Sequence, residues 1–144
     1  MPLSHALAAL PHGPCFRFID KLTALIPGQS GIATYTVRGD EAFLAGHFPG
    51  QPLMPGVILI EALAQLGGVV AQSDPAIPVL FDLKLTAVRG AKITGSAVPG
   101  EILTIRAGVA GRMGGLIQVQ GEVLVGDLVI LTAQITLSGT SASV

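Results

Sequence analysis

Cysteine, aromatic residues and charge are all scarce in this 144-residue sequence. It contains one cysteine and no tryptophan, and charged residues make up 12% of the chain, against about 25% in a typical soluble domain. The single Cys15 excludes an internal disulfide framework and a cysteine-rich zinc site, and it favours a reducing, cytoplasmic setting. We predict a buried thiol at Cys15, because no base is placed to make it a nucleophile. The low charge predicts that part of the surface is buried against another copy of the chain.

Several classes of partner are excluded by what else is missing. The formal net charge is −1 and no run of Lys and Arg is present, so no nucleic-acid partner is predicted. The longest apolar stretch, residues 57–71, is interrupted by Glu61 and Gln65 and falls short of the ~20 residues that cross a bilayer. The glycines at residues 111–115 lack the lysine and the strand-to-helix context of a phosphate-binding loop. We therefore predict no membrane span, no metal site and no cofactor.

The order of predicted elements indicates one α+β domain that spans residues 1–144. An irregular, proline-rich stretch at residues 42–56 precedes an apolar helix. The consecutive strands that follow, joined by short turns, form an antiparallel sheet, and a helix that is apolar on nearly every side is best covered by that sheet curling around it. The predicted elements are helices at residues 3–10 and 57–72, strands at residues 16–26, 31–37, 79–93, 102–109, 116–125 and 128–137, and a frayed tail from Ser138.

The stretch HFPGQPLMPGV and the helix after it bring together residues with acid–base chemistry. His47 lies on a loop stiffened by prolines, and a histidine accepts a proton near neutral pH. Glu61 lies in the second turn of the apolar helix with no Lys or Arg within four residues, and burial favours the protonated form of a carboxylic acid, which can donate a proton. The N–H of Gly56 at the helix start is a free donor in a region that favours negative charge. A base, an acid and an oxyanion donor are the groups that elimination next to a thioester carbonyl requires.

Each of these residues also has an ordinary structural explanation. A histidine in a loop is often solvated, and a carboxylate in an apolar helix can be satisfied by backbone groups or by a partner chain. Gln65 lies one turn after Glu61 on the same helix face, where it either orients the acid or satisfies a neighbouring backbone group. For His12 we expect a structural role. From residue types and spacing alone, both explanations stay open.

The run HFPGQPLMPGVILIEALAQ resembles the active-site segment of β-hydroxyacyl-acyl-carrier-protein dehydratases of the FabZ type. The motif of that family, H-F-P-G-x-P-x-x-P-G-V-x-x-x-E-A-x-A-Q, is matched at every fixed position. Weaker likeness extends through Leu10-Pro11-His12 and Phe18-Ile19-Asp20 to the segment AVPGE at residues 97–101. The resemblance implies the hot-dog fold, a curved antiparallel sheet wrapped around the central helix. It also implies homodimers, often assembled as trimers of dimers.

The resemblance implies roles for individual residues as well. His47 corresponds to the base that removes a proton from the α-carbon of a (3R)-hydroxyacyl thioester, and Glu61 to the acid that assists loss of the β-hydroxyl as water. In the family's dimers these two groups face each other from different subunits across a tunnel for the acyl chain. Glutamate rather than aspartate at position 61 resembles the dehydratase-only branch. The residues that we assign to the oxyanion and substrate-binding region are Gly56, Val57, Gln65, Phe48 and Phe81.

Basic residues around the tunnel mouth, where an acidic carrier protein docks in this family, are depleted in this sequence. Gly13, Thr94 and Gly95 stand where the family often has Arg or Lys. Arg89 and Lys92 are the remaining candidates for carrier contact, and they are equally well explained as solvated surface charges. Fewer basic residues predict weaker electrostatic steering of an acidic carrier protein. The sequence therefore leaves open whether the acyl group is carried by an acyl carrier protein or by coenzyme A.

Two other functions compete with a lyase of fatty-acid, related lipid or polyketide biosynthesis. A hot-dog thioesterase uses a carboxylate with water, and a non-catalytic acyl-thioester-binding subunit tolerates loss of either catalytic residue. Both His47 and Glu61 are present, which favours the dehydratase. The sequence leaves open the acyl chain length, the pathway, and whether dimers or hexamers form.

Overall fold

The computed structural model describes residues 3–8, 10–45, 50 and 52–141. In chain order its elements are α1 (Leu3–Leu7), the 3-10 helix η1 (Pro14–Phe16), β1 (Lys21–Ile26), β2 (Ser30–Thr36), the 3-10 helix η2 (Ala42–Ala45), α2 (Gly56–Ala71), β3 (Leu80–Ile93), β4 (Ile102–Met113), β5 (Leu116–Val125) and β6 (Leu128–Ser141). The predicted α+β class, in which a run of strands follows one long helix, is confirmed.

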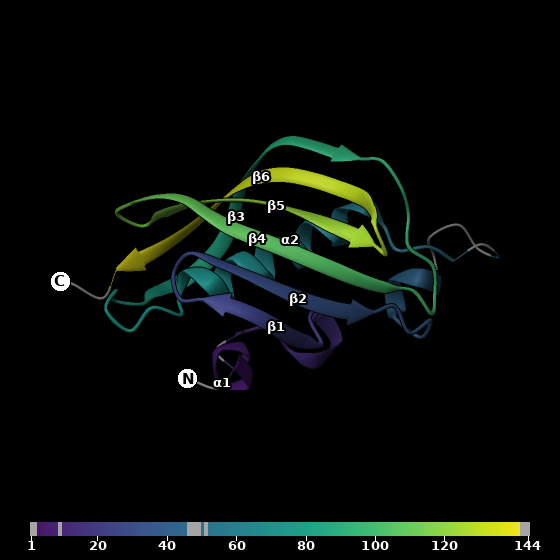
Figure 1. Ribbon diagram of the computed structural model, residues 1–144, viewed down its shortest axis with the longest axis horizontal. Coiled ribbons are helices and arrows are strands. Elements are labelled where there is room, and N and C mark those ends of the chain that lie inside the picture. The colour runs from purple at the N-terminus through teal and green to yellow at the C-terminus, as the bar shows by residue number, and fades with distance from the viewer. Residues whose placement is uncertain (1–2, 9, 46–49, 51, 142–144) are drawn as a thin grey trace.

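All six strands belong to one antiparallel sheet with the order β1-β2-β4-β5-β6-β3. Figure 1 shows this sheet curving around α2, with α1 beside β1. In β4, Leu103 and Ile105 are buried, whereas Arg106 is exposed. Successive side chains of a strand point to opposite faces of the sheet. The apolar side chains therefore point to the helix and the polar ones to the outer face.

Helix α2 lies at the centre of the core but is open along one side. Leu63 is fully buried, and a Cβ at Gly31 of β2 would lie 2.8 Å from Cγ2 of Val70, so helix and sheet approach closely. Val57, however, is 69% exposed and the side chain of Glu61 is 21% exposed. The helix is therefore buried on most sides, as expected, and one side is exposed in the single chain. No helix in the described ranges is long and apolar enough to cross a membrane.

The segment before β1 differs from the prediction. The strand expected from Phe16 begins only at Lys21, and Cys15 is exposed within η1 rather than buried. The side chain of Gln65 pairs with the backbone of this segment: its Nε2 donates to Phe16 O at 2.8 Å, and the N–H of Phe18 donates to its Oε1 at 2.9 Å. Because a helix side chain engages these backbone groups, the segment does not begin the strand at Phe16.

Two strands are longer than predicted. β4 runs to Met113, and its register with β5 shifts between Val109 and Gly111, so the glycine stretch continues the strand through an irregularity instead of ending it. β6 runs to Ser141, which pairs with Leu80 of β3. The fraying predicted from Ser138 is therefore wrong for residues 138–141, because β3 holds them in the sheet.

Strand β3 forms one edge of the sheet and is irregular. Its pairing with β6 shifts register in three places, and Asp82 (φ 54°) and Gly90 (φ 60°) lie within two of these shifts. Phe81, Val88 and Ile93 remain 51%, 46% and 51% exposed. On its far side β3 has no neighbouring strand among the residues described. A long edge with exposed apolar side chains is a surface that natural proteins usually cover.

Candidate active site

A cavity of about 700 Å³ lies between α2, the loop before η1 and strand β3. That size is typical of sites for small organic ligands. Its polar side chains come from three parts of the chain: His12 from the loop, Glu61, Gln65 and Gln72 from α2 and its end, and Asp82 and Lys84 from β3. The other lining side chains are largely apolar and include Leu10, Phe16, Val69, Phe81, Leu83, Leu85 and Leu137. The cavity is thus an apolar pocket with a carboxylate in its wall.

The carboxylate of Glu61 is held at one of its two oxygens. Gln65 Nε2 donates a hydrogen bond to Oε2 at 3.1 Å, and His12 Nε2 lies 3.3 Å from the same oxygen. Gln65 also forms hydrogen bonds with the backbone of Phe16 and Phe18. It therefore contacts the carboxylate of Glu61 and satisfies backbone groups at the same time, the two alternatives that the sequence left open. Among the described residues, no hydrogen bond to Oε1 accompanies these contacts at Oε2.

His12, for which the sequence predicted a structural role, lines the cavity beside Glu61. Two hydrogen bonds from Arg17 hold its loop: Nε donates to His12 O and Nη2 to Leu10 O, each at 2.8 Å. The weak likeness at Leu10-Pro11-His12 was a signal for this position. No spacing rule, however, joins His12 to Glu61 across 49 residues of chain, because the contact depends on how Gln65 ties the intervening segment to α2.

The predicted site residues fall into three groups. Glu61, Gln65 and Phe81 line the same cavity. Gly56 and Val57 form the first turn of α2. The first hydrogen bond of this turn is donated by the N–H of Ile58 to Pro55 O at 2.9 Å, and the N–H groups of Gly56 and Val57 precede it in the chain. His47 and Phe48 lie outside the described residues.

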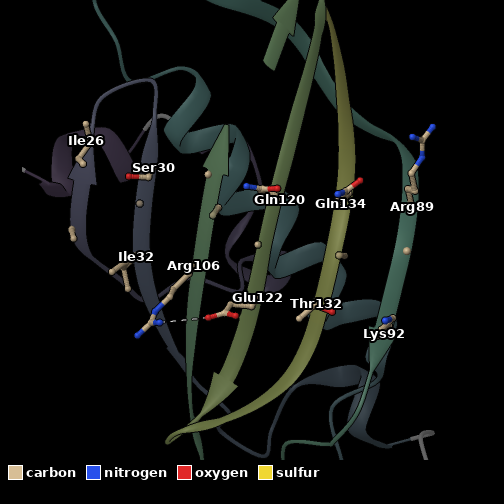
Figure 2. Close-up of a pocket in the computed structure, with 17 residues that line it drawn as sticks. Ile26, Ser30, Ile32, Arg89, Lys92, Arg106, Gln120, Glu122, Thr132 and Gln134 are labelled. Carbon is tan, nitrogen blue, oxygen red and sulfur yellow. Dashed lines mark hydrogen bonds and ion pairs between the residues drawn. The ribbon is translucent and has the colours of Figure 1, made fainter. Parts of the chain in front are cut away.

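Arg89 and Lys92 lie away from this cavity. Figure 2 shows them on β3, at one side of a groove of about 900 Å³ on the outer face of the sheet, with β1 and β2 at the other side. Between them and β2, Arg106 Nη1 and Glu122 Oε2 form an ion pair of 3.5 Å. The cation that lines the cavity of Glu61 is Lys84, which the sequence analysis did not single out.

Glu41 is a second carboxylate, and it fixes the chain shortly before the segment that contains His47. Its Oε2 accepts hydrogen bonds from Tyr35 Oη at 2.5 Å and the N–H of Arg38 at 2.9 Å, and its Oε1 accepts one from the N–H of Gly39 at 2.7 Å. Burial acts to raise the pKa of Glu41, but these hydrogen bonds outweigh it, and the pKa is lowered. Burial and the bond to Glu41 raise the pKa of Tyr35. The pair therefore stays a carboxylate with a neutral phenol, which is a structural anchor.

The described ranges hold no cluster of three or more metal-binding side chains.

Solved structures resemble this fold at low sequence identity. The Dehydratase Heterocomplex ApeI:P from Xenorhabdus doucetiae superimposes with a TM-score of 0.78 and 17% identity, over 99% of this chain and 93% of that one. A hypothetical thioesterase protein with coenzyme A from Streptococcus pneumoniae has a TM-score of 0.64 and 12% identity, over 84% and 85% of the two chains. These likenesses concern the fold alone, and the predicted hot-dog fold is confirmed.

Sequence comparison gives the family. The chain is 34% identical over 139 residues to the 3-hydroxyacyl-[acyl-carrier-protein] dehydratase FabZ of Anaplasma phagocytophilum, which covers 94% of this chain and 96% of that protein. It is 37% identical over 119 residues to the FabZ of an Anaeromyxobacter species, over 81% and 75% of the two chains. The model of the FabA-like domain matches residues 10–134. The chain therefore belongs to the FabA-like family, and these two relatives are named as FabZ dehydratases.

Proposed function

We propose that this chain is a 3-hydroxyacyl thioester dehydratase, a hydro-lyase of fatty-acid biosynthesis that acts on acyl groups borne by an acyl carrier protein. The observation that carries the proposal is the carboxylate of Glu61, held at one oxygen by Gln65 and His12 in the wall of an apolar cavity of about 700 Å³. Relatives of matching length are named for this activity. The segment that contains the family's base, beginning at His47, is present in full.

In the proposed reaction His47 removes a proton from the α-carbon, and the electron pair of that C–H bond forms the double bond between the α- and β-carbons. The bond from the β-carbon to its oxygen breaks while Glu61 supplies a proton to the leaving hydroxyl, which departs as water. The N–H of Gly56 stabilises the charge that develops on the thioester oxygen. The product is a trans-2-enoyl thioester. Transfer of one proton from His47 back to Glu61, directly or through solvent, restores both groups.

The proposal includes a homodimer, alone or within a trimer of dimers, in which a second copy covers β3. Pairing of two equivalent edge strands about a two-fold axis joins their sheets and buries the same surface on each copy. The exposed Phe81, Val88 and Ile93 on β3 support such an interface, as does the exposed Val57 on the open side of α2. In the resembled family, this arrangement brings the base of one subunit to the acid of the other.

The test is a direct assay of the purified protein with a (3R)-hydroxyacyl thioester, offered on acyl carrier protein and on coenzyme A. Mass spectrometry follows the loss of one water. We expect conversion by the wild type and near-background rates for His47→Ala and Glu61→Gln. Glu122→Gln, an equivalent change on the outer face of the sheet, serves as the matched control and should keep wild-type activity.

Each result of this assay has a definite meaning. The preferred carrier shows whether the depleted basic surface matters for docking. Release of free acid instead of enoyl thioester favours a thioesterase. No conversion on either carrier by a folded wild-type protein contradicts the proposed function and favours an acyl-thioester-binding subunit.

A further inference from the structure

We propose that His12 is a positioning residue for Glu61, so that His12, Gln65 and Glu61 act as one acid unit; this inference rests on the proposed function. His12 and Gln65 approach the same carboxylate oxygen, Oε2, from different elements. Two contacts at one oxygen restrict the movement of the carboxyl group, and the described residues make no hydrogen bond to the other oxygen. A side chain held in this way loses less freedom when it reacts.

The hydrogen-bonding pattern of His12 supports this role. Its Nδ1 is buried and has no hydrogen-bond partner in the part of the chain that the structure describes, so the polar contact found for the ring is the one from Nε2 to Glu61. Burying a ring nitrogen without a partner costs free energy. A fold that tolerates this cost while directing Nε2 at a carboxylate in a cavity is consistent with a function at that contact.

The loop that carries His12 is fixed at several points. Arg17 donates hydrogen bonds to the carbonyl groups of Leu10 and His12. Gln65 bonds the backbone on either side of Arg17, at Phe16 and Phe18. One glutamine on α2 therefore holds both the carboxylate and the loop that brings the imidazole to it.

The chemical consequence concerns the charge that develops on Glu61. As Glu61 gives up its proton, the N–H at His12 Nε2 stabilises the carboxylate that forms. The other charged groups around His12 are few: Asp82 and Lys84 of β3 line the same cavity, and the guanidinium of Arg17 is bonded to loop carbonyls. A change of His12 should therefore alter the step that uses the acid more than it alters binding of the acyl chain.

The experiment compares His12→Leu, His12→Gln and His5→Gln with the wild type, by kcat, KM and their pH dependence on the hydroxyacyl thioester. We expect His12→Leu to lower kcat by about ten- to a hundredfold, the loss of one close polar contact with a charged group. Its KM should change less than about threefold. The pH dependence of kcat should differ from that of the wild type, because His12 contacts the acid that this step uses. His12→Gln keeps an N–H donor and should restore most of kcat, and His5→Gln on α1 should change none of these values.

The outcomes separate this inference from the function on which it rests. An active wild type whose kcat and pH profile are unchanged by His12→Leu, even with a lower melting temperature, overturns the positioning role alone. An inactive wild type overturns the proposed function and this inference with it. If His12→Leu does not fold, His12→Asn replaces it, since that shorter amide does not reach Oε2. Equal activity of the Asn and Gln variants then contradicts the proposal.

Discussion

At the scale of single residues, the Tyr35–Glu41 pair predicts how stability depends on pH. The pKa of Glu41 is lowered in the fold, so its ionised form contributes stability that is present at neutral pH and is lost as the pH falls through the folded pKa, below the ordinary value of 4.5. The pKa of Tyr35 is raised, so its contribution is present below the ordinary value of 10.0 and is lost as the pH rises through the folded pKa. The free energy of unfolding should therefore fall at both low and high pH.

The variant Glu41→Gln tests the acid side of this dependence. It should lower the free energy of unfolding at neutral pH by roughly 1–3 kcal/mol, the cost of replacing a buried hydrogen-bonded carboxylate. Its melting temperature should then fall less than that of the wild type between about pH 6 and pH 3. Asp40→Asn, one residue away and exposed, is the control and should follow the wild-type slope. A Glu41→Gln variant with the wild-type slope would show that this carboxylate is not the titrating group.

Single residues also show where sequence is a sufficient guide to the site and where it is not. Glu61 and Gln65 were predicted from residue type and helical spacing, and the structure places both in one cavity. The contact of His12 with Glu61 was not predicted, because it depends on hydrogen bonds from Arg17 and Gln65 to backbone groups that no side-chain pattern records. Lys84 was missed for a related reason: it lines the cavity because of where the fold places β3, which composition does not record.

At the scale of elements, the close approach of α2 to the sheet depends on glycines in the strands. A Cβ at Gly121 of β5 would lie 2.1 Å from Arg106 O and 2.5 Å from Leu63 Cδ1, whereas a Cβ at Gly111 of β4 would meet nothing within 4 Å. Gly121→Ala should therefore lower the free energy of unfolding by roughly 1–3 kcal/mol through overpacking. Gly111→Ala is the matched control and should change it little. Denaturant unfolding measures both, and equal losses would show that strand propensity, not helix packing, sets the cost.

The elements themselves were largely predictable because their signals are local. α2 was expected at residues 57–72 and spans Gly56–Ala71, and the β5 strand was expected at residues 116–125, as observed. Apolar content, alternation and the glycine and proline turns that set these bounds all lie within a few residues. The failures have distant causes. The expected strand at Phe16 is replaced because Gln65 of α2 engages its backbone, and the last residues of β6 are ordered because they pair with β3.

At the scale of the whole molecule, the uncovered edge of β3 predicts self-association. A charge placed on this edge should be costly when two copies pair there. Val88→Asp should convert the proposed dimer, or a larger assembly of it, into smaller species, as measured by light scattering. Leu128→Asp is the matched control, because Leu128 is 64% exposed at the start of β6, and it should leave the mass unchanged. A Val88→Asp protein with the wild-type mass would place the interface elsewhere.

Mixing two inactive variants tests whether the site is shared between subunits. If the base and the acid of each site come from different subunits, a dimer of His47→Ala with Glu61→Gln has one site in which both residues are altered and one site that is intact. With random exchange of subunits half of the dimers are mixed, so such a mixture should recover about a quarter of wild-type activity. If both residues of a site come from one subunit, every site keeps one altered residue and mixing restores nothing. The mixture is co-refolded and assayed beside each variant alone, and recovery that disappears when Val88→Asp is added to both chains would connect catalysis to the β3 edge.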